Sequence, residues 1–140
     1  MEENPQNLLP IVMEAVVGKR DKVKIFGNDY ETRDGTCIRD YIHVTDLGSA
    51  HALALEYLDK GGDSQILNLG TSRGSSVLEM IEKTQEVIGR PVPYEFAPRR
   101  AGDPAVVTAK PDKAKEILGW EATHSDLENI IKSTWNVYQQ

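Results

Sequence analysis

Residues 25–47 read Ile-Phe-Gly-Asn-Asp-Tyr-Glu-Thr-Arg-Asp-Gly-Thr-Cys-Ile-Arg-Asp-Tyr-Ile-His-Val-Thr-Asp-Leu, and the pattern of this stretch changes twice. Its first two residues end a short apolar run, 23–26, which predicts a strand closed by the turn signal that follows. Residues 36–44 alternate and are rich in β-branched and aromatic side chains, so we expect extended backbone there. Thr45 then suits the N-cap of a helix, and Asp46 suits its positive end. Strand, turn, extended segment and helix in one short stretch predict an α/β chain.

The sequence on either side continues this alternation. Upstream, apolar residues at helical spacing predict a helix over 7–18. Downstream, the helix that begins at Thr45 should end near Gly61-Gly62, and the apolar run 65–70 predicts a strand.

Two capping boxes predict further helix starts. Ser76 and Glu79 open a helix that runs through Ile88, and Ser125 and Glu128 open the last helix. The other expected elements are a strand over 92–96, a loop over 97–103, an extended stretch over 105–109 and a short helix whose first residue is Pro111 and which ends at Gly119. We therefore expect one domain over residues 1–140.

Composition excludes several classes of function. The chain carries 16 Lys and Arg against 22 Asp and Glu, a formal net charge of -6, so we expect no nucleic-acid partner. The single cysteine, Cys37, excludes an internal disulfide and a Cys-x-x-Cys pair. The three histidines, His43, His51 and His124, lack the i, i+4 spacing of a helical zinc site, and we predict no metal ligands.

Hydropathy predicts a cytoplasmic chain with no membrane contact. No apolar run reaches the roughly 18 residues that a membrane span requires. Residues 1–4 are acidic, where a signal peptide would be basic.

The strongest local candidate for a binding site is the loop over 97–104, which holds Arg99 and Arg100 between Gly and Pro residues. A guanidinium presents a rigid fork of donors that matches phosphate oxygens, and Asp103 could accept a sugar hydroxyl. The alternative is that both arginines are solvated or paired with surface carboxylates.

The sequence allows two roles for each of the side chains of Arg39 and Phe26. Arg39 lies in an apolar extended run, so it either pairs with Asp40 or another acid, or points into a cleft. Phe26 offers a ring or strand-edge backbone to a planar base, or packs in the core. The sequence carries no Gly-x-Gly-x-x-Gly, P-loop, Gly-x-Ser-x-Gly or His-Glu-x-x-His motif, so the residues alone indicate a binding domain without an assignable chemistry.

Taken together, these segments resemble the C-terminal substrate-binding portion of the UDP-glucose 4-epimerases, which belong to the extended short-chain dehydrogenase/reductase superfamily. The order of the segments carries the resemblance, which spans essentially the whole chain. Sister families such as the sugar-nucleotide 4,6-dehydratases share the Arg39-Asp40-Tyr41 type of run, but Asn28-Asp29-Tyr30 followed by Asp34-Gly35-Thr36 is similar to the epimerase version. The matching segments are 5–10, 25–47, 68–70 and 97–104.

The resemblance implies a set of residues that hold the UDP part of a sugar nucleotide. Asn7, Arg39 and Arg100 would meet diphosphate oxygens and nearby hydroxyls, and Asp103 would take ribose hydroxyls. At the position of Ala101 the family often has a glutamate, so a side-chain contact is lost there. Val107 matches a position beside the 2-substituent of the sugar, where a small side chain would admit an N-acetyl group. The full implied set is Asn7, Leu8, Lys24, Ile25, Phe26, Arg39, Arg100, Ala101, Gly102 and Asp103, with Val107 for sugar specificity.

The resemblance also implies what this sequence lacks. The NAD-binding Rossmann half, with its Gly-rich turn, catalytic Ser/Thr and Tyr-x-x-x-Lys, is missing, so we assign no catalytic or cofactor-binding residue and expect the chain alone to be inactive. The complete enzyme would use NAD to interconvert UDP-glucose and UDP-galactose through a 4-keto sugar, would accept UDP-N-acetylhexosamines, and would form a homodimer. The alternatives are a non-catalytic sugar-nucleotide-binding module that complements a second chain, and a decayed piece without function.

Overall fold

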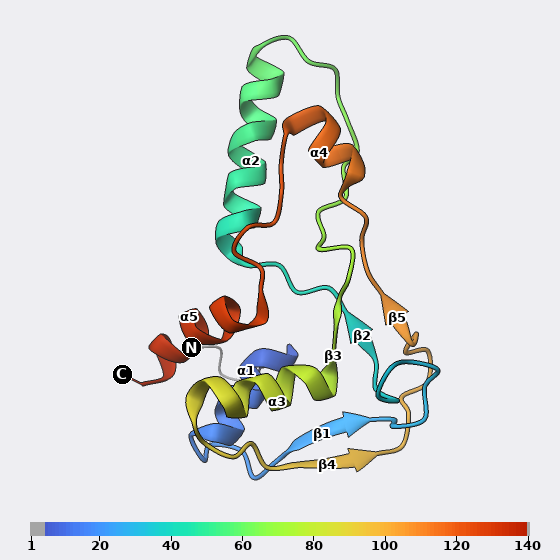
Figure 1. The fold of residues 1–140 in the computed structure, drawn as a ribbon, viewed down its shortest axis with the longest axis vertical. Helices are drawn as coiled ribbons and strands as arrows, with labels where there is room; N and C mark the ends of the chain where they lie inside the picture. The colour runs from blue at the N-terminus through green and yellow to red at the C-terminus, as the bar shows by residue number, and fades with distance from the viewer. Residues whose placement is uncertain (1–4, 140) are drawn as a thin grey trace.

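The structure, a computed structural model, describes residues 5–139 and orders the chain as alternating helices and short strands (Figure 1). Residues 1–4, whose acidic character entered the expectation of a cytoplasmic chain, lie outside the described range. The elements are α1 (Leu8–Val16), β1 (Val23–Phe26), β2 (Ile38–Arg39), α2 (Val44–Asp59), β3 (Ser75–Ser76), α3 (Val77–Ile88), β4 (Tyr94–Ala97), β5 (Val106–Val107), α4 (Asp112–Leu118) and α5 (Leu127–Tyr138). The predicted α/β class is confirmed. None of the helices in the described range has both the length and the apolar character to cross a membrane.

The strands form two small sheets. β1 and β4 pair in parallel, with Val23 opposite Tyr94. In the second sheet β2 is central, antiparallel to β3 and parallel to β5. Figure 1 shows β1 and β4 along one end of the molecule beneath α1 and α3, α2 and α4 at the other end, and the second sheet between them.

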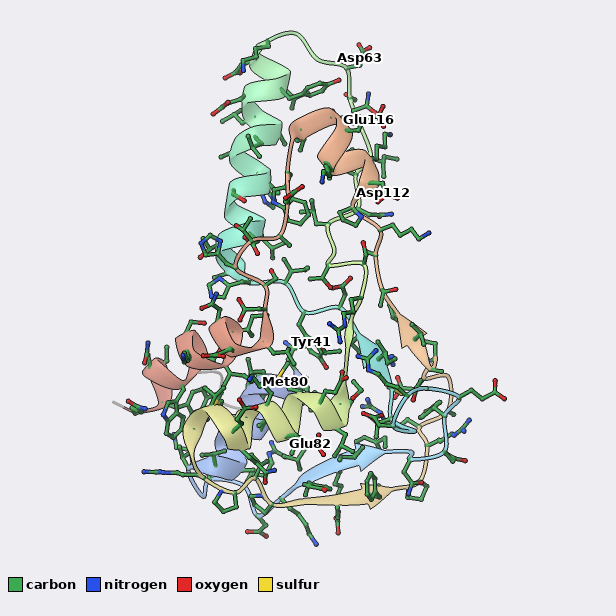
Figure 2. The ribbon with its side chains drawn as sticks, viewed as in Figure 1. Tyr41, Asp63, Met80, Glu82, Asp112 and Glu116 are labelled. Carbon is green, nitrogen blue, oxygen red and sulfur yellow. The ribbon has the colours of Figure 1, made fainter. Side chains whose placement is uncertain are left out.

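Three apolar clusters hold these elements together. The first joins α1, β1 and α3 through residues such as Val12, Val23 and Ile81. The second joins α1, α3 and α5 around Met13, Met80 and Ile131, and Tyr41 packs against it (Figure 2). The third lies between α2 and α4 around Ala50, Ala114 and Trp120.

The predicted strand over 65–70 is wrong, because no strand is present over these residues. Their alternation is real: Leu67 and Leu69 pack against the cluster around Trp120, whereas Ile66 is 89% exposed. A strand also needs a neighbouring strand for its backbone hydrogen bonds, and within residues 5–139 no strand pairs with this segment.

Two of the predicted helix caps are displaced. The N-cap of α2 is His43, not Thr45, and its Nδ1 accepts a hydrogen bond from the Thr45 backbone N–H at 3.1 Å. The N-cap of α5 is Asp126, not Ser125. Pro111 likewise precedes α4 rather than opening it. The capping box that opens α3 at Ser76 is confirmed.

Three buried or half-buried aspartates, Asp34, Asp40 and Asp46, fasten the segment around β2 to distant parts of the chain. Their carboxylates accept backbone and hydroxyl hydrogen bonds, which satisfies charges that would be costly to bury alone. The distant donors are Ser76 for Asp34, Thr71 and Ala109 for Asp40, and Thr123, His124 and Ser125 for Asp46. This network fixes the course of the chain on both sides of Arg39.

Candidate functional site

One pocket, of about 150 Å³, gathers six of the residues that the sequence singled out. They come from α1, from the first strand, from the central strand of the second sheet and from the loop after β4. Three cations and one carboxylate line the pocket, which makes it positive in a chain of net charge -6. The six residues are Leu8, Lys24, Phe26, Arg39, Arg100 and Asp103.

Five predicted residues do not line this pocket. Asn7 is exposed at the N-cap of α1, and Ile25 alternates with the pocket residues of β1 and is buried in the core. Ala101 and Gly102 form the exposed tip of the loop, where the left-handed φ of +84° suits glycine. Val107 is half-exposed on β5.

Cys37 and Tyr41 also line the pocket, although neither was among the predicted binding residues. Cys37 lies two positions before Arg39 and Tyr41 two positions after it. Every second side chain of an extended stretch points the same way, so the three side chains share one face. That alternation was the signal that could have found them. Burial raises the pKa of Tyr41 to about 12, so its hydroxyl stays protonated at neutral pH. The other lining residues that were not singled out are Gln6, Ile11, Val23 and Val77.

Arg39 is held rigidly by the backbone around it. Its Nη1 donates to the carbonyl oxygens of Ile38 at 2.8 Å and Pro104 at 2.9 Å. Its Nη2 lies 3.5 Å from Asp103 Oδ1. Of the two interpretations, pairing with Asp40 is wrong, because the Asp40 carboxylate accepts from Thr71 and Ala109 instead. Arg39 both pairs with another acid and lines the pocket.

Arg100 meets the same carboxylate from the other side. Its Nε donates to Asp103 Oδ2 at 2.9 Å, and its guanidinium lies 4.4 Å from the centre of the Phe26 ring. The side chain remains 62% exposed. Asp103 therefore bridges two arginines, and Phe26 carries one of them on its face.

Arg99 is adjacent in sequence but does not line the pocket. Its Nε donates to Asp29 Oδ1 at 2.7 Å, and its guanidinium lies 4.0 Å from the centre of the Tyr30 ring. The surface-pairing interpretation is thus correct for Arg99, which serves as a natural comparison for Arg100.

The arrangement suits binding rather than proton transfer. Two convergent guanidinium groups can donate to phosphate oxygens, and a carboxylate between them can accept from hydroxyls. Within the described residues, no cluster of three or more His, Cys, Asp or Glu side chains could hold a metal ion.

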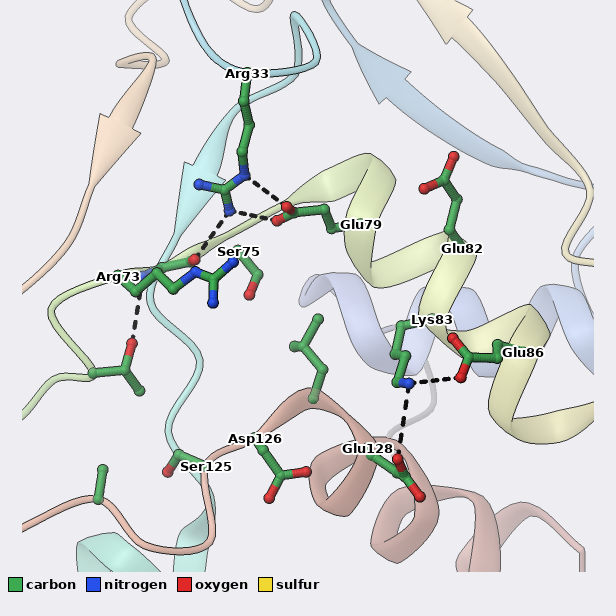
Figure 3. A pocket seen from close by; sticks show the side chains of 14 residues that line it. Arg33, Arg73, Ser75, Glu79, Glu82, Lys83, Glu86, Ser125, Asp126 and Glu128 are labelled. Carbon is green, nitrogen blue, oxygen red and sulfur yellow. Dashed lines mark hydrogen bonds and ion pairs between the residues drawn. The ribbon is translucent and has the colours of Figure 1, made fainter.

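A larger cavity, of about 730 Å³, lies between α3 and the start of α5 and contains none of the predicted residues. Figure 3 shows Arg33 directed at Glu79, and Lys83 directed at Glu86 and Glu128. Arg33 Nε donates to Glu79 Oε1 at 2.6 Å, and Lys83 Nζ donates to Glu86 Oε1 at 2.8 Å. Because these charges already pair with one another, we assign no ligand to this cavity.

Comparison with known proteins agrees with the resemblance seen in the sequence. The UDP-glucose 4-epimerase of Halalkalibacterium halodurans is 49% identical over 140 residues, 99% of this chain and 42% of the relative. The UDP-glucose 4-epimerase of Rhizobium leguminosarum bv. trifolii is 52% identical over 128 residues, 91% of this chain and 39% of the relative. The chain thus spans about two fifths of the length of these curated relatives.

Solved structures show the same fold. The UDP-glucose 4-epimerase of Stenotrophomonas maltophila, with bound NAD and formylated UDP-arabinopyranose, superposes with a TM-score of 0.95 and 44% identity over 99% of this chain and 41% of that chain. The UDP-glucose 4-epimerase of Bifidobacterium longum, in complex with NAD+ and UDP, superposes with a TM-score of 0.87 and 42% identity over 94% of this chain and 39% of that chain. The family model described as GDP-mannose 4,6 dehydratase matches residues 2–134. The chain therefore belongs to the GDP-mannose 4,6 dehydratase family, and the relatives named here are its UDP-glucose 4-epimerases.

Proposed function

We propose that residues 1–140 form the UDP-sugar-binding region of a UDP-glucose 4-epimerase. The observation that carries the proposal is the convergence of Arg39 and Arg100 on Asp103 in one pocket, beside Phe26. Two guanidinium groups match a diphosphate, and a carboxylate matches the hydroxyls of a ribose. The identity to relatives named as epimerases favours this function over a non-catalytic complementing module.

In the proposed complex, the diphosphate lies between Arg39 and Arg100, with Asn7 close by. The backbone from Lys24 to Phe26 borders the uracil, and Leu8, which lines the same pocket, packs beside it. The loop from Arg100 to Asp103, with Ala101 and Gly102 at its tip, carries the ribose contact, and Val107 lies towards the sugar.

The pocket is too small to enclose a nucleotide sugar. At about 150 Å³ it is below the roughly 300–1,000 Å³ that is typical of small-molecule sites. We infer that it forms one wall of the site, and that residues outside this sequence supply the other wall and the NAD contacts. The sequence holds neither a Gly-x-Gly-x-x-Gly turn nor a Tyr-x-x-x-Lys motif, so we assign no catalytic role to these residues. We further propose UDP-glucose and UDP-galactose as substrates, a cytoplasmic location and a homodimer for the complete enzyme.

Activity of a joined protein tests the proposal. This chain would be joined to the remaining segment of the Halalkalibacterium epimerase, and conversion of UDP-galactose to UDP-glucose would be measured. We expect turnover from the joined protein, and none from the 140-residue chain with added NAD. A joined protein that folds and binds NAD but does not turn over UDP-galactose would refute the assignment, and turnover by the chain alone would refute the predicted dependence on further residues.

A further inference from the structure

We propose that Asp103 determines which phosphate compounds the pocket accepts, by excluding those that bring no hydroxyl groups to its carboxylate. The inference rests on the proposed function and goes beyond it, because the same residue that would accept ribose hydroxyls acts against other anions. Free pyrophosphate and diphosphates without a vicinal diol are the excluded ligands.

The carboxylate already occupies the place of an anion. Asp103 Oδ2 accepts from Arg100 Nε at 2.9 Å, and Asp103 Oδ1 lies 3.5 Å from Arg39 Nη2. Three quarters of the Asp103 side chain is buried, with 25% exposed. A phosphate that binds the two arginines therefore competes with Asp103 for the same guanidinium groups.

The backbone of Asp103 is held beside both arginines. Its backbone N–H donates to the Arg100 carbonyl oxygen at 3.3 Å, so the two residues lie on one tight turn. The next residue, Pro104, supplies its carbonyl oxygen to Arg39 Nη1 at 2.9 Å. The side chain of Asp103 is consequently attached close to any anion that the two arginines hold.

The outcome then depends on what else the ligand carries. A ligand with a vicinal diol donates hydroxyl hydrogen bonds to the carboxylate oxygens that the arginines release. A ligand without hydroxyls leaves the carboxylate with fewer partners and next to a like charge. Repulsion of this kind is how a site discriminates against a competing ligand.

Calorimetric titration of wild type and Asp103→Asn with UDP and with inorganic pyrophosphate tests the inference. We expect the substitution to tighten pyrophosphate binding about tenfold, because a like charge is removed, and to weaken UDP binding about tenfold, because a charged acceptor is lost. Asp29→Asn is the matched control, because it removes the same charge from a residue that pairs with Arg99 outside the pocket. We expect it to change either affinity less than about twofold.

A second comparison changes the ligand. Wild type should bind UDP at least about tenfold more tightly than 2′,3′-dideoxy-UDP, and Asp103→Asn should lose this preference. Pyrophosphate affinity that stays equal or falls in Asp103→Asn, or rises equally in Asp29→Asn, would overturn the inference while UDP binding by wild type left the proposed function intact. Absence of UDP binding by wild type would instead overturn both.

Discussion

Arg39 on β2 and Val107 on β5 are directly paired in parallel register. Side chains of directly paired residues project from the same face of a sheet, so Val107 stands beside the arginine that lines the pocket. Its neighbour Val106 pairs with the buried Ile38 and projects from the opposite face. The register thus supports the position of Val107 next to the proposed sugar.

Val107→Tyr should narrow sugar choice. In the joined epimerase we expect wild type to accept both UDP-glucose and UDP-N-acetylglucosamine, because Val107 is small. The tyrosine should lower kcat/KM for the N-acetylated sugar relative to UDP-glucose by about tenfold or more, since overpacking costs about 1–3 kcal/mol. Val106→Tyr is the control and should leave the ratio unchanged. An unchanged ratio in Val107→Tyr would show that Val107 does not limit the pocket.

Arg100→Ala should weaken UDP binding by about 1.5–3 kcal/mol, the value of hydrogen bonds to a charged group. Arg99→Ala removes the same side chain one position earlier, where it pairs with Asp29, and should change the affinity less than about twofold. Calorimetry with UDP measures both. Equal affinities for wild type and Arg100→Ala would exclude a phosphate contact by Arg100.

Asp46 should make stability depend on acid pH. Burial alone would raise the pKa of this carboxyl, but hydrogen bonds from Ser125, His124 and Thr123 outweigh burial and lower the pKa below the ordinary 3.8. Folding therefore favours the ionised form, and the resulting stability is complete well above pH 3.8 and is lost as the pH falls through the folded pKa.

The comparison of Asp46→Asn with wild type measures this effect. We expect the substitution to lower the free energy of unfolding by about 1.5–3 kcal/mol at pH 7, and the difference to shrink below about pH 4. Asp59→Asn, an exposed position on the same helix, should change stability by less than about 0.5 kcal/mol. Urea denaturation followed by circular dichroism gives the values. A difference that did not depend on pH would contradict the role of the ionised carboxylate.

The 140-residue chain should self-associate. Leu55 is 60% exposed and Ile66 is 89% exposed, and burying apolar surface gains about 25 cal/mol per Å². Sedimentation velocity should show a mass that rises with concentration, and Leu55→Lys with Ile66→Lys should restore the monomer. Val137→Lys, at a position of 51% exposure on α5, is the control. A wild-type monomer at every concentration, with one cooperative melt at high temperature, would disprove the expectation.

The helices were predictable because their signals are local. Ser76 caps α3 with its side chain, and Gly89 ends it with a left-handed φ of +70°. The segment 65–70 was not predictable, because alternation reports an inner and an outer face but not whether another strand lies alongside. The cap at His43 was missed because an imidazole nitrogen is an unusual acceptor at a helix start.

The candidate site was predictable only in part for a similar reason. Arg39 is distant in sequence from Arg100 and Asp103, and composition and spacing alone did not bring it to their loop. The resemblance to the epimerases grouped them, and the pocket contains all three. Cys37 and Tyr41 were not among the predicted binding residues, although their positions two residues before and after Arg39 place all three on one face of an extended stretch.

The long-range hydrogen bonds of Asp34, Asp40 and Asp46 can form only in a certain order during synthesis of the chain. Each carboxylate accepts a hydrogen bond from a residue that is made later. The donors are Ser76 for Asp34, Ala109 for Asp40 and Ser125 for Asp46. Asp46 and Ser125 are 79 positions apart, so this contact at the start of α2 forms only after residue 125 has been made. A chain that ended before position 123 would therefore leave the buried Asp46 carboxylate without its donors from 123–125, and a buried charge without hydrogen-bond partners lowers stability.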